Sequence, residues 1–250
     1  MPEKNYNDIN AKAISDHLSY AISLANALNY RLEEKELYEE IRILNEQVKS
    51  CYRALAELQN SIEISQYDAG KVEPISFNLS RHIEHLVSTI RSRMISSTIE
   101  IIDSIEKGVM CYANPDRLSS CVINLIINAL QNVDREEGKV RIIVKRSSDS
   151  AVVSVIDNGY AMSSERLSRI LAQEDGMHGL DICKRFCRLV GTEPMFETRE
   201  NSGFTVIVRI PLAPPEDKLK FNSDMVYMKS GSMSPCTILL YKLEEASVVL

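Results

Sequence analysis

The sequence predicts an α+β protein in which an N-terminal helical hairpin precedes an α/β sandwich. Residues 1–68 carry apolar seams in steps of three and four, which is typical of packed helices. Gly70 and Pro74 then mark a linker. Residues 69–212 interleave helical and β-rich segments without strict βαβ alternation, so we expect a mixed sheet with helices on one face. The tail, residues 213–250, shows one strand-like run and no motif with a clear meaning.

The N-terminal domain contains two seams whose registers differ. The first runs through Ile14, Leu18, Ala21, Ala25, Leu28 and Leu32, and the second begins at Ile41 and ends at Ile62. The register breaks near "EEKE", which favours an antiparallel hairpin, although one bent continuous helix also fits because this stretch has no Gly or Pro. A lone hairpin buries one seam of each helix, so we expect a homodimer that forms a four-helix bundle.

Charge, apolar runs and cysteine spacing indicate which partners and which cellular compartment to expect. The formal net charge of −6 argues against nucleic acid as the main partner, since phosphate neutralisation requires a basic surface. No apolar run reaches the ~18 to 20 residues of a membrane span, and the N-terminus lacks the apolar core of a signal peptide. The six cysteines form no CxxC pair. These features predict a cytoplasmic protein.

The second domain is predicted to contain the following elements in order. A helix with one apolar stripe from Leu79 to Met94 is followed by two short β-rich runs, and Asn114 caps a helix that has Pro115 in its first turn. His82 and His85 lie three residues apart on the first helix, and with no further ligands nearby we expect a solvated helix face. The remaining elements are strands at 139–146 and 151–158, helices at 163–172 and 179–190, and strands at 194–200 and 204–212.

Three asparagines on the helix "VINLIINALQNV" require a partner. The helix is apolar on nearly every side, yet Asn124, Asn128 and Asn132 follow one another at intervals of four residues and stack along one face. Burying an amide without a hydrogen-bond partner costs roughly 1 to 3 kcal/mol, so the stripe indicates a ligand.

Two further motifs downstream of this helix also carry groups suited to binding a ligand. "VIDNGYAM" brings Asp157 out of an apolar strand into a turn at Gly159, where a carboxylate can accept a hydrogen bond from an exocyclic amine. "EDGMHGLDICKRF" places Gly176 and Gly179 before a helix, where backbone amides and the helix dipole bind phosphate.

In this order the motifs resemble the Bergerat-fold ATP-binding domain of sensor histidine kinases, DNA gyrase and MutL-type repair ATPases. The likeness is closest to the histidine kinases and covers roughly residues 74–212. "NPDRLSSCVINLIINALQNV" is similar to their N box, "DNGYAM" and "HGLDICKRF" to their glycine boxes, and "SGFTVIVRIPL" to their closing strand. The resemblance implies ATP and Mg²⁺ as cofactors.

The resemblance also implies a role for each matched position. Asn128 would coordinate Mg²⁺ at the ATP phosphates, and Asn124 would line the same groove. Asp157 would bind the adenine amine, Gly159 would make room for the base, and Thr205 would close the adenine side. The complete set of expected ATP-binding residues is Asn124, Asn128, Gln131, Asn132, Asp157, Gly159, Met162, Gly176, Gly179, Leu180 and Thr205.

The chain departs from the family pattern at several of these positions. Gln131 and Asn132 replace a common Lys-Tyr pair, and Ala161 replaces the second Gly of the first glycine box. Asp175 and Met177 occupy two of the three Gly positions of the second box. Only 16 residues separate Met162 from Gly179, so the resemblance implies a short ATP lid.

A histidine kinase also requires a phosphoacceptor, for which His17 is the candidate because it is the only histidine of the first helix. An ungapped match to the family's Ser-His-Glu-Leu instead aligns Asp16, and His17 as a plain surface residue stays open. Asn124 stands where the repair and topoisomerase ATPases place a water-activating Glu, which favours transfer to a side chain over hydrolysis.

The sequence therefore predicts a cytosolic histidine protein kinase that autophosphorylates and passes the phosphoryl group to the receiver domain of a response regulator. Two alternatives stay open. One is a histidine phosphotransferase with a degenerate ATPase domain that binds receiver domains without using ATP. The other is a scaffold that binds nucleotide without transfer.

Overall fold

The structure, a computed structural model, describes Ile43 and residues 73–94, 98–133, 137–159, 178–198 and 203–216. The chain divides into two compact units, Met1–Ile62 and Glu63–Leu250. The predicted hairpin, the helix expected at 163–172 and the tail from residue 217 onward lie outside the described residues. Apart from Ile43, every described residue belongs to the second unit.

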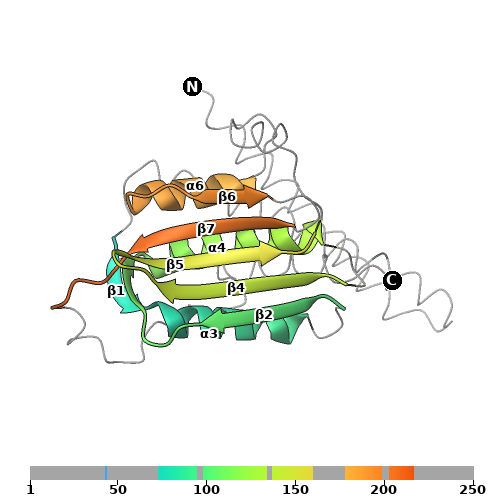
Figure 1. The fold of residues 1–250 in the computed structure, drawn as a ribbon, viewed down its shortest axis with the longest axis horizontal. Helices are drawn as coiled ribbons and strands as arrows, with labels where there is room; N and C mark the ends of the chain where they lie inside the picture. The colour runs from blue at the N-terminus through green and yellow to red at the C-terminus, as the bar shows by residue number, and fades with distance from the viewer. Residues whose placement is uncertain are drawn as a thin grey trace, which may run out of the picture. The chain divides into compact units, whose positions relative to one another are not determined.

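The described part of this unit contains ten helices and strands in the following order (Figure 1). They are β1 (Ile75–Asn78), α3 (Leu79–Arg93), β2 (Glu100–Ile105), β3 (Met110–Ala113), α4 (Pro115–Asn132), β4 (Lys139–Arg146), β5 (Ser150–Asp157), α6 (His178–Leu189), β6 (Met195–Thr198) and β7 (Phe204–Pro211).

Five of the strands form one mixed sheet in the order β2-β4-β5-β7-β6. Strand β2 is parallel to β4, and the other three pairs are antiparallel. The mixed sheet without strict βαβ order is as predicted. Strand β1 pairs separately with β3. It was not predicted, because its four residues lead directly into α3 and carry no turn signal between strand and helix.

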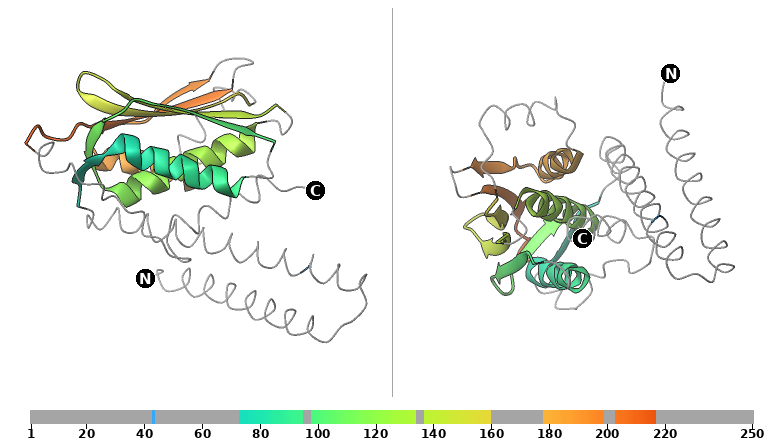
Figure 2. Two further views of the ribbon diagram at one scale, coloured as in Figure 1. Left: turned by 90° about the horizontal axis from the view of Figure 1, so that it is seen from below. Right: turned by 90° about the vertical axis from the view of Figure 1, so that its right-hand side faces the viewer.

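The three described helices cover one face of the sheet (Figure 2). Strand residues alternate between the two faces, so every second side chain packs beneath these helices. Val140, Ile142 and Val144 of β4 are buried, as are Val206 and Val208 of β7. The α/β sandwich with helices on one face is therefore confirmed, and α4 packs against both α3 and α6.

Asparagine caps fix where α3 and α4 begin. Asn114 Oδ1 accepts a hydrogen bond from the backbone amide of Arg117 at 3.1 Å, and Pro115 occupies the first turn, as predicted. Asn78 caps α3 in the same way through Arg81, also at 3.1 Å. Each cap satisfies a backbone donor that the helix itself leaves unpaired. The cap of α4 fixes the start of the helix that carries the asparagine stripe.

The prediction of a solvated face for His82 is wrong. His82 is buried between α3 and α4, and its Nε2 lies 2.7 Å from Ser119 Oγ. Because the Ser119 hydroxyl donates to the carbonyl of Pro115 at 2.9 Å, Nε2 of His82 is the donor to Ser119. Burial, with a smaller contribution from His85, lowers the pKa of His82 to about 4. His85 is exposed, as predicted.

Two further features of the described residues concern membrane spans and cysteines. None of their helices is long and apolar enough to cross a bilayer. Cys111, Cys121, Cys183 and Cys187 are free thiols, and all four are buried. Burial raises the pKa of Cys111, which keeps it in the unreactive thiol form.

Candidate functional site

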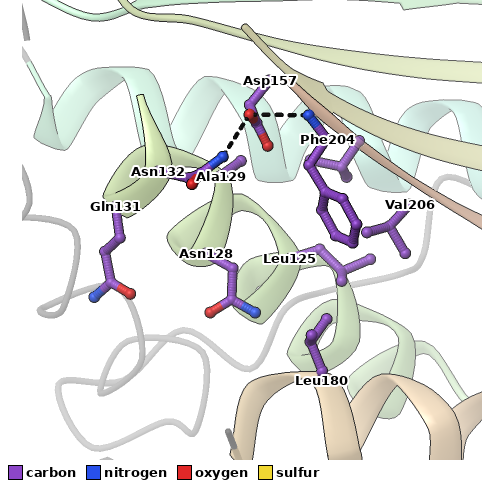
Figure 3. Close-up of a pocket in the computed structure, with 10 residues that line it drawn as sticks. Leu125, Asn128, Ala129, Gln131, Asn132, Asp157, Leu180, Phe204 and Val206 are labelled. Atoms are coloured by element: carbon purple, nitrogen blue, oxygen red, sulfur yellow. Dashed lines mark hydrogen bonds between the residues drawn. The ribbon is translucent and has the colours of Figure 1, made fainter. Parts of the chain in front are cut away.

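A cavity of about 170 Å³ lies between α4, α6 and the inner face of β5 and β7 (Figure 3). Its lining is largely apolar, with amides and one carboxylate at one side, which is the usual composition of a small-molecule site. The lining residues are Leu125, Asn128, Ala129, Gln131, Asn132, Val155, Asp157, Leu180, Phe204 and Val206.

The three stacked asparagines of α4 occupy three different environments. Asn124 is 3% exposed, and its Nδ2 donates to the backbone carbonyl of Ser120 at 2.9 Å. Asn132 Nδ2 donates to Asp157 Oδ1 at 2.9 Å. Asn128 lines the cavity, and its buried Nδ2 has no hydrogen-bond partner among the described residues. The expected requirement for a ligand is therefore concentrated at Asn128.

Asp157 ends β5 and is anchored through one oxygen. Its Oδ1 accepts from Asn132 Nδ2 and the Gly159 amide, both at 2.9 Å, and from the Phe204 amide at 3.2 Å. Oδ2 accepts no hydrogen bond from the part of the chain that the structure describes. Burial raises the pKa of Asp157, and the three hydrogen bonds partly offset that rise. Asp157 therefore offers a fixed acceptor inside a largely apolar cavity.

Glycines allow the elements around Asp157 to approach closely. A Cβ on Gly159 would lie 2.1 Å from the backbone oxygen of Asn132, and one on Gly203 would lie 1.9 Å from that of Asp157. Gly203 also has φ +79°, a left-handed conformation that favours glycine. The expected role of Gly159, space for a base, is in this structure space for the end of α4.

Gly179 lies in the first turn of α6, directly against the asparagine stripe. A Cβ on it would lie 3.2 Å from both Asn124 Oδ1 and Asn128 Nδ2. Leu180, the next residue, lines the cavity. The N-terminus of α6 therefore adjoins Asn128, and this brings together the amides and the helix start that the sequence placed about 50 residues apart.

The structure brings most of the predicted residues to this cavity and excludes one that it describes. Asn128, Gln131, Asn132, Asp157 and Leu180 line it, whereas Asn124, Gly159 and Gly179 support its walls. His17, Met162 and Gly176 lie outside the described residues.

Thr205 does not reach the cavity, which corrects that expectation. Side chains alternate along β7, so Phe204 and Val206 face the helices while Thr205 lies on the opposite face beside Ser154 and Ile156. Its two neighbours, and not Thr205, therefore line the cavity. The strict alternation of apolar residues in "FTVIVRIP" was a sequence signal that could have identified them.

The described residues include no cluster of three or more His, Cys, Asp or Glu side chains that would hold a metal ion unaided. Asn128 nevertheless fits a cation that is bound mainly by a ligand's oxygens. Its amide nitrogen is buried and has no partner in the described ranges, and a side-chain flip exchanges its nitrogen and oxygen. A carbonyl oxygen is a suitable ligand for Mg²⁺.

Comparison with known proteins agrees with this geometry. Residues 113–214 match the family described as histidine kinase-, DNA gyrase B-, and HSP90-like ATPase. This match begins at the last residue of β3, includes α4 and the cavity, and ends just past β7.

The curated relatives of this chain include a histidine kinase and a sporulation kinase. Over 198 residues the chain is 24% identical to hybrid signal transduction histidine kinase B of Dictyostelium discoideum, covering 70% of this chain and 10% of that protein. It is 24% identical over 192 residues to sporulation kinase D of Bacillus subtilis (strain 168), covering 74% of this chain and 36% of that protein. The chain thus spans about a third or less of the length of these relatives.

Solved structures show the same fold. The nucleotide-free catalytic domain of histidine kinase ThkA matches with a TM-score of 0.52 at 25% identity, covering 57% of this chain and 99% of that one. ThkA in complex with response regulator protein TrrA matches with a TM-score of 0.57 at 22% identity, covering 84% of this chain and 62% of that one.

The fold and the family match define an α/β ATPase domain of the GHKL class, the class that includes DNA gyrase B, HSP90 and the histidine kinases. The likeness to histidine kinases in sequence and structure specifies it further: the chain carries a sensor histidine kinase catalytic core with this ATPase domain.

Proposed function

We propose that this chain is an ATP-dependent protein-histidine kinase that binds Mg-ATP in the cavity, autophosphorylates His17 and passes the phosphoryl group to an aspartate of a response regulator. One observation carries the nucleotide site. The unpartnered amide of Asn128 and the anchored carboxylate of Asp157 line the same largely apolar cavity.

The end at Asp157 suits a purine base. With Oδ1 held by three donors, Oδ2 is left to accept a hydrogen bond from an exocyclic amine such as that of adenine. Leu125, Phe204 and Val206 supply apolar contact for a flat ring. Figure 3 shows the Phe204 ring beside Val206, across the cavity from Asn128.

The other end suits phosphates. Gly179 and Leu180 lie in the first turn of α6, where backbone amides and the helix dipole favour an anion. Asn128 would hold Mg²⁺ through its amide oxygen. The ion neutralises charge on the phosphates when bound. Gln131 adds a neutral amide at the position where a lysine is common in the family, so the described lining contributes no positive side chain.

The residues around Asn128 favour transfer over hydrolysis. Activating water requires a base near the terminal phosphate. Asn124 is not a base, and its amide is engaged with Ser120. Among the described lining residues the only ionisable group is Asp157, which we place at the base end. A phosphoryl group held there is protected until a neutral imidazole reaches it.

The remaining parts of the proposal concern residues outside the described ranges. His17 would be the attacking imidazole, and the N-terminal hairpin would form a homodimer that presents it. The structural relative ThkA was solved in complex with a response regulator, which supports a receiver domain as the partner. We place the protein in the cytoplasm.

The test is incubation with γ-labelled ATP and Mg²⁺, followed by the stability of the bound label to acid and base. We expect acid-labile, base-stable label that is absent from His17→Ala and Asn128→Ala. The matched controls are His85→Ala, an exposed histidine of α3, and Asn158→Ala, an amide outside the cavity; both should retain the label.

Each other outcome contradicts a part of the proposal. Label that survives His17→Ala refutes the acceptor. Binding of Mg-ATP without label favours the scaffold, and absence of Mg-ATP binding at millimolar concentration favours a phosphotransferase that does not use ATP.

A further inference from the structure

We propose that Asn132 is a positioning residue of the base end: its carboxamide fixes the Asp157 carboxylate so that Oδ2 is presented to the ligand. This inference rests on the proposed nucleotide site and adds a residue that orients one of its ligand-binding groups. Asn132 ends α4, and Asp157 ends β5, so the contact joins two elements that meet at the cavity.

The geometry around Oδ1 singles out Asn132. Of the three described donors to this oxygen, those of Gly159 and Phe204 are backbone amides, and only that of Asn132 is a side chain. Figure 3 shows the bonds from Asn132 and Phe204 converging on one oxygen of Asp157. With the Gly159 amide, three donors hold this oxygen, which leaves Oδ2 for a ligand.

The contact is a feature of this chain. Asn132 occupies the position where the family commonly has Tyr, so its bond to Asp157 does not follow from the resemblance. Asn132 lines the cavity, whereas Asn158, one residue beyond Asp157, uses its side chain differently. Asn158 accepts from the Lys139 amide at 2.6 Å and donates to the Glu137 carbonyl at 2.9 Å, and so holds the start of β4. The two amides therefore have separable roles.

The contact also controls the charge of Asp157. Burial raises the pKa of this carboxyl, and the bonds from Asn132, Gly159 and Phe204 lower it. The groups that face it from α4, α6 and β7 within the described lining are Asn128, Gln131, Leu180, Phe204 and Val206, none of which titrates. Removing the Asn132 donor should therefore raise the pKa of Asp157 further. A protonated carboxyl is a poorer acceptor, so base binding should be lost at a higher pH.

The first experiment measures Mg-ADP affinity by calorimetry from pH 5 to pH 8 in the full chain and in Asn132→Leu. Mg-ADP is the probe because it contains the base and cannot transfer a γ-phosphoryl group. We expect Asn132→Leu to bind roughly ten-fold more weakly at pH 7 and to lose binding at a higher pH than the parent. Asn132→Asp, which has the same shape but adds a carboxylate beside Asp157, should move the loss to a still higher pH.

The control is Asn158→Ala. Loosening the end of β5 without touching the carboxylate should lower thermal stability and leave the pH at which binding is lost unchanged. Asn132 variants that bind Mg-ADP like the parent at every pH would overturn the inference. So would a shift in Asn158→Ala as large as that in Asn132→Leu, because the effect would then be merely structural.

A second readout requires no nucleotide and separates the two proposals. The carboxyl ¹³C resonance of Asp157, followed by NMR against pH, should titrate at a higher pH in Asn132→Leu than in the parent. If the parent fails to bind Mg-ADP, the proposed function fails, yet this shift would still support the role of Asn132. If the parent binds and the resonance titrates identically in both proteins, the inference fails while the function stands.

Discussion

Helix α4 buries polar side chains on two flanks. One flank is packed against α3, and the other borders the cavity. Toward α3, His82 Nε2 and Ser119 bond to each other and Ser119 also bonds to Pro115, while His82 Nδ1 is buried without a described partner inside this packed interface. Toward α6 and the sheet, Asn128 and one oxygen of Asp157 have no partner among the described residues, beside a cavity. A polar group that is paired within the protein contributes to the fold. One left unpaired beside a cavity is available to a ligand.

The largest effect should follow from adding one methyl group beside Asp157. Gly203→Ala places a left-handed residue and a Cβ only 1.9 Å from the Asp157 carbonyl oxygen, so we expect a loss of about 2 to 5 kcal/mol in the free energy of unfolding. Gly191→Ala is the matched control, with φ +75° but no described atom within 4 Å of the added Cβ, and should lose about 1 to 2 kcal/mol. Equal losses for the two variants in urea unfolding would contradict the close approach of Gly203 to the Asp157 backbone.

The α3 flank should be sensitive to acid. The pKa of His82 is about 4 when folded and 6.5 when unfolded, so the unfolded state binds the proton more tightly. Its contribution to stability is complete above pH 6.5 and is lost as the pH falls toward 4. A factor of ten in proton affinity corresponds to about 1.4 kcal/mol, so the loss should be about 3 kcal/mol.

The measurement is the free energy of unfolding against pH for the parent and for His82→Gln, which keeps a donor but does not titrate in this window. The variant should have a shallower slope between pH 6.5 and 4, since the buried imidazole that takes up a proton on unfolding is then absent. Parallel curves would contradict the burial of His82. Affinity for Mg-ADP at pH 7.5 should be the same in both proteins, because His82 lies away from the cavity flank.

On the cavity flank, Asp157→Asn should weaken nucleotide binding without lowering stability, the opposite of what is expected for His82. The amide oxygen can still accept the three anchoring bonds, but Nδ2 now presents a donor where the ligand's amine also donates. Affinity for Mg-ADP should fall about 10- to 100-fold, as expected for a lost hydrogen bond to a charged group. Stability at pH 7 should be unchanged or higher, because burial penalises the ionised form of Asp157. A variant that binds like the parent would remove Asp157 from the site.

Local signals in the sequence predicted much of this domain. The cap at Asn114, the asparagine stripe of α4 and the apolar strands all arise from residues a few positions apart, where spacing alone determines the outcome. These signals located α4, the sheet strands and Asp157. They also brought Asn128 and Asp157 into one hypothesis, although the two residues are far apart in the sequence.

Features that depend on long-range pairing were not predictable in the same way. The bond from Asn132 to Asp157 requires the end of α4 to pack against the end of β5, and the approach of Gly203 to Asp157 requires the register of β5 against β7. A single sequence specifies neither. The burial of His82 depends on Ser119, a residue 37 positions away. Strand β1 is defined by its partner β3, and its own sequence contains no distinctive signal.

The most direct test of a shared nucleotide site is a crystal structure of the chain with Mg²⁺ and a non-hydrolysable ATP analogue. We expect the adenine amine within hydrogen-bonding distance of Asp157 Oδ2, the ring against Phe204 and Val206, and the metal bound to Asn128 Oδ1. A nucleotide bound elsewhere, or a cavity still closed to it at millimolar analogue, would contradict the claim that Asn128 and Asp157 form one nucleotide site.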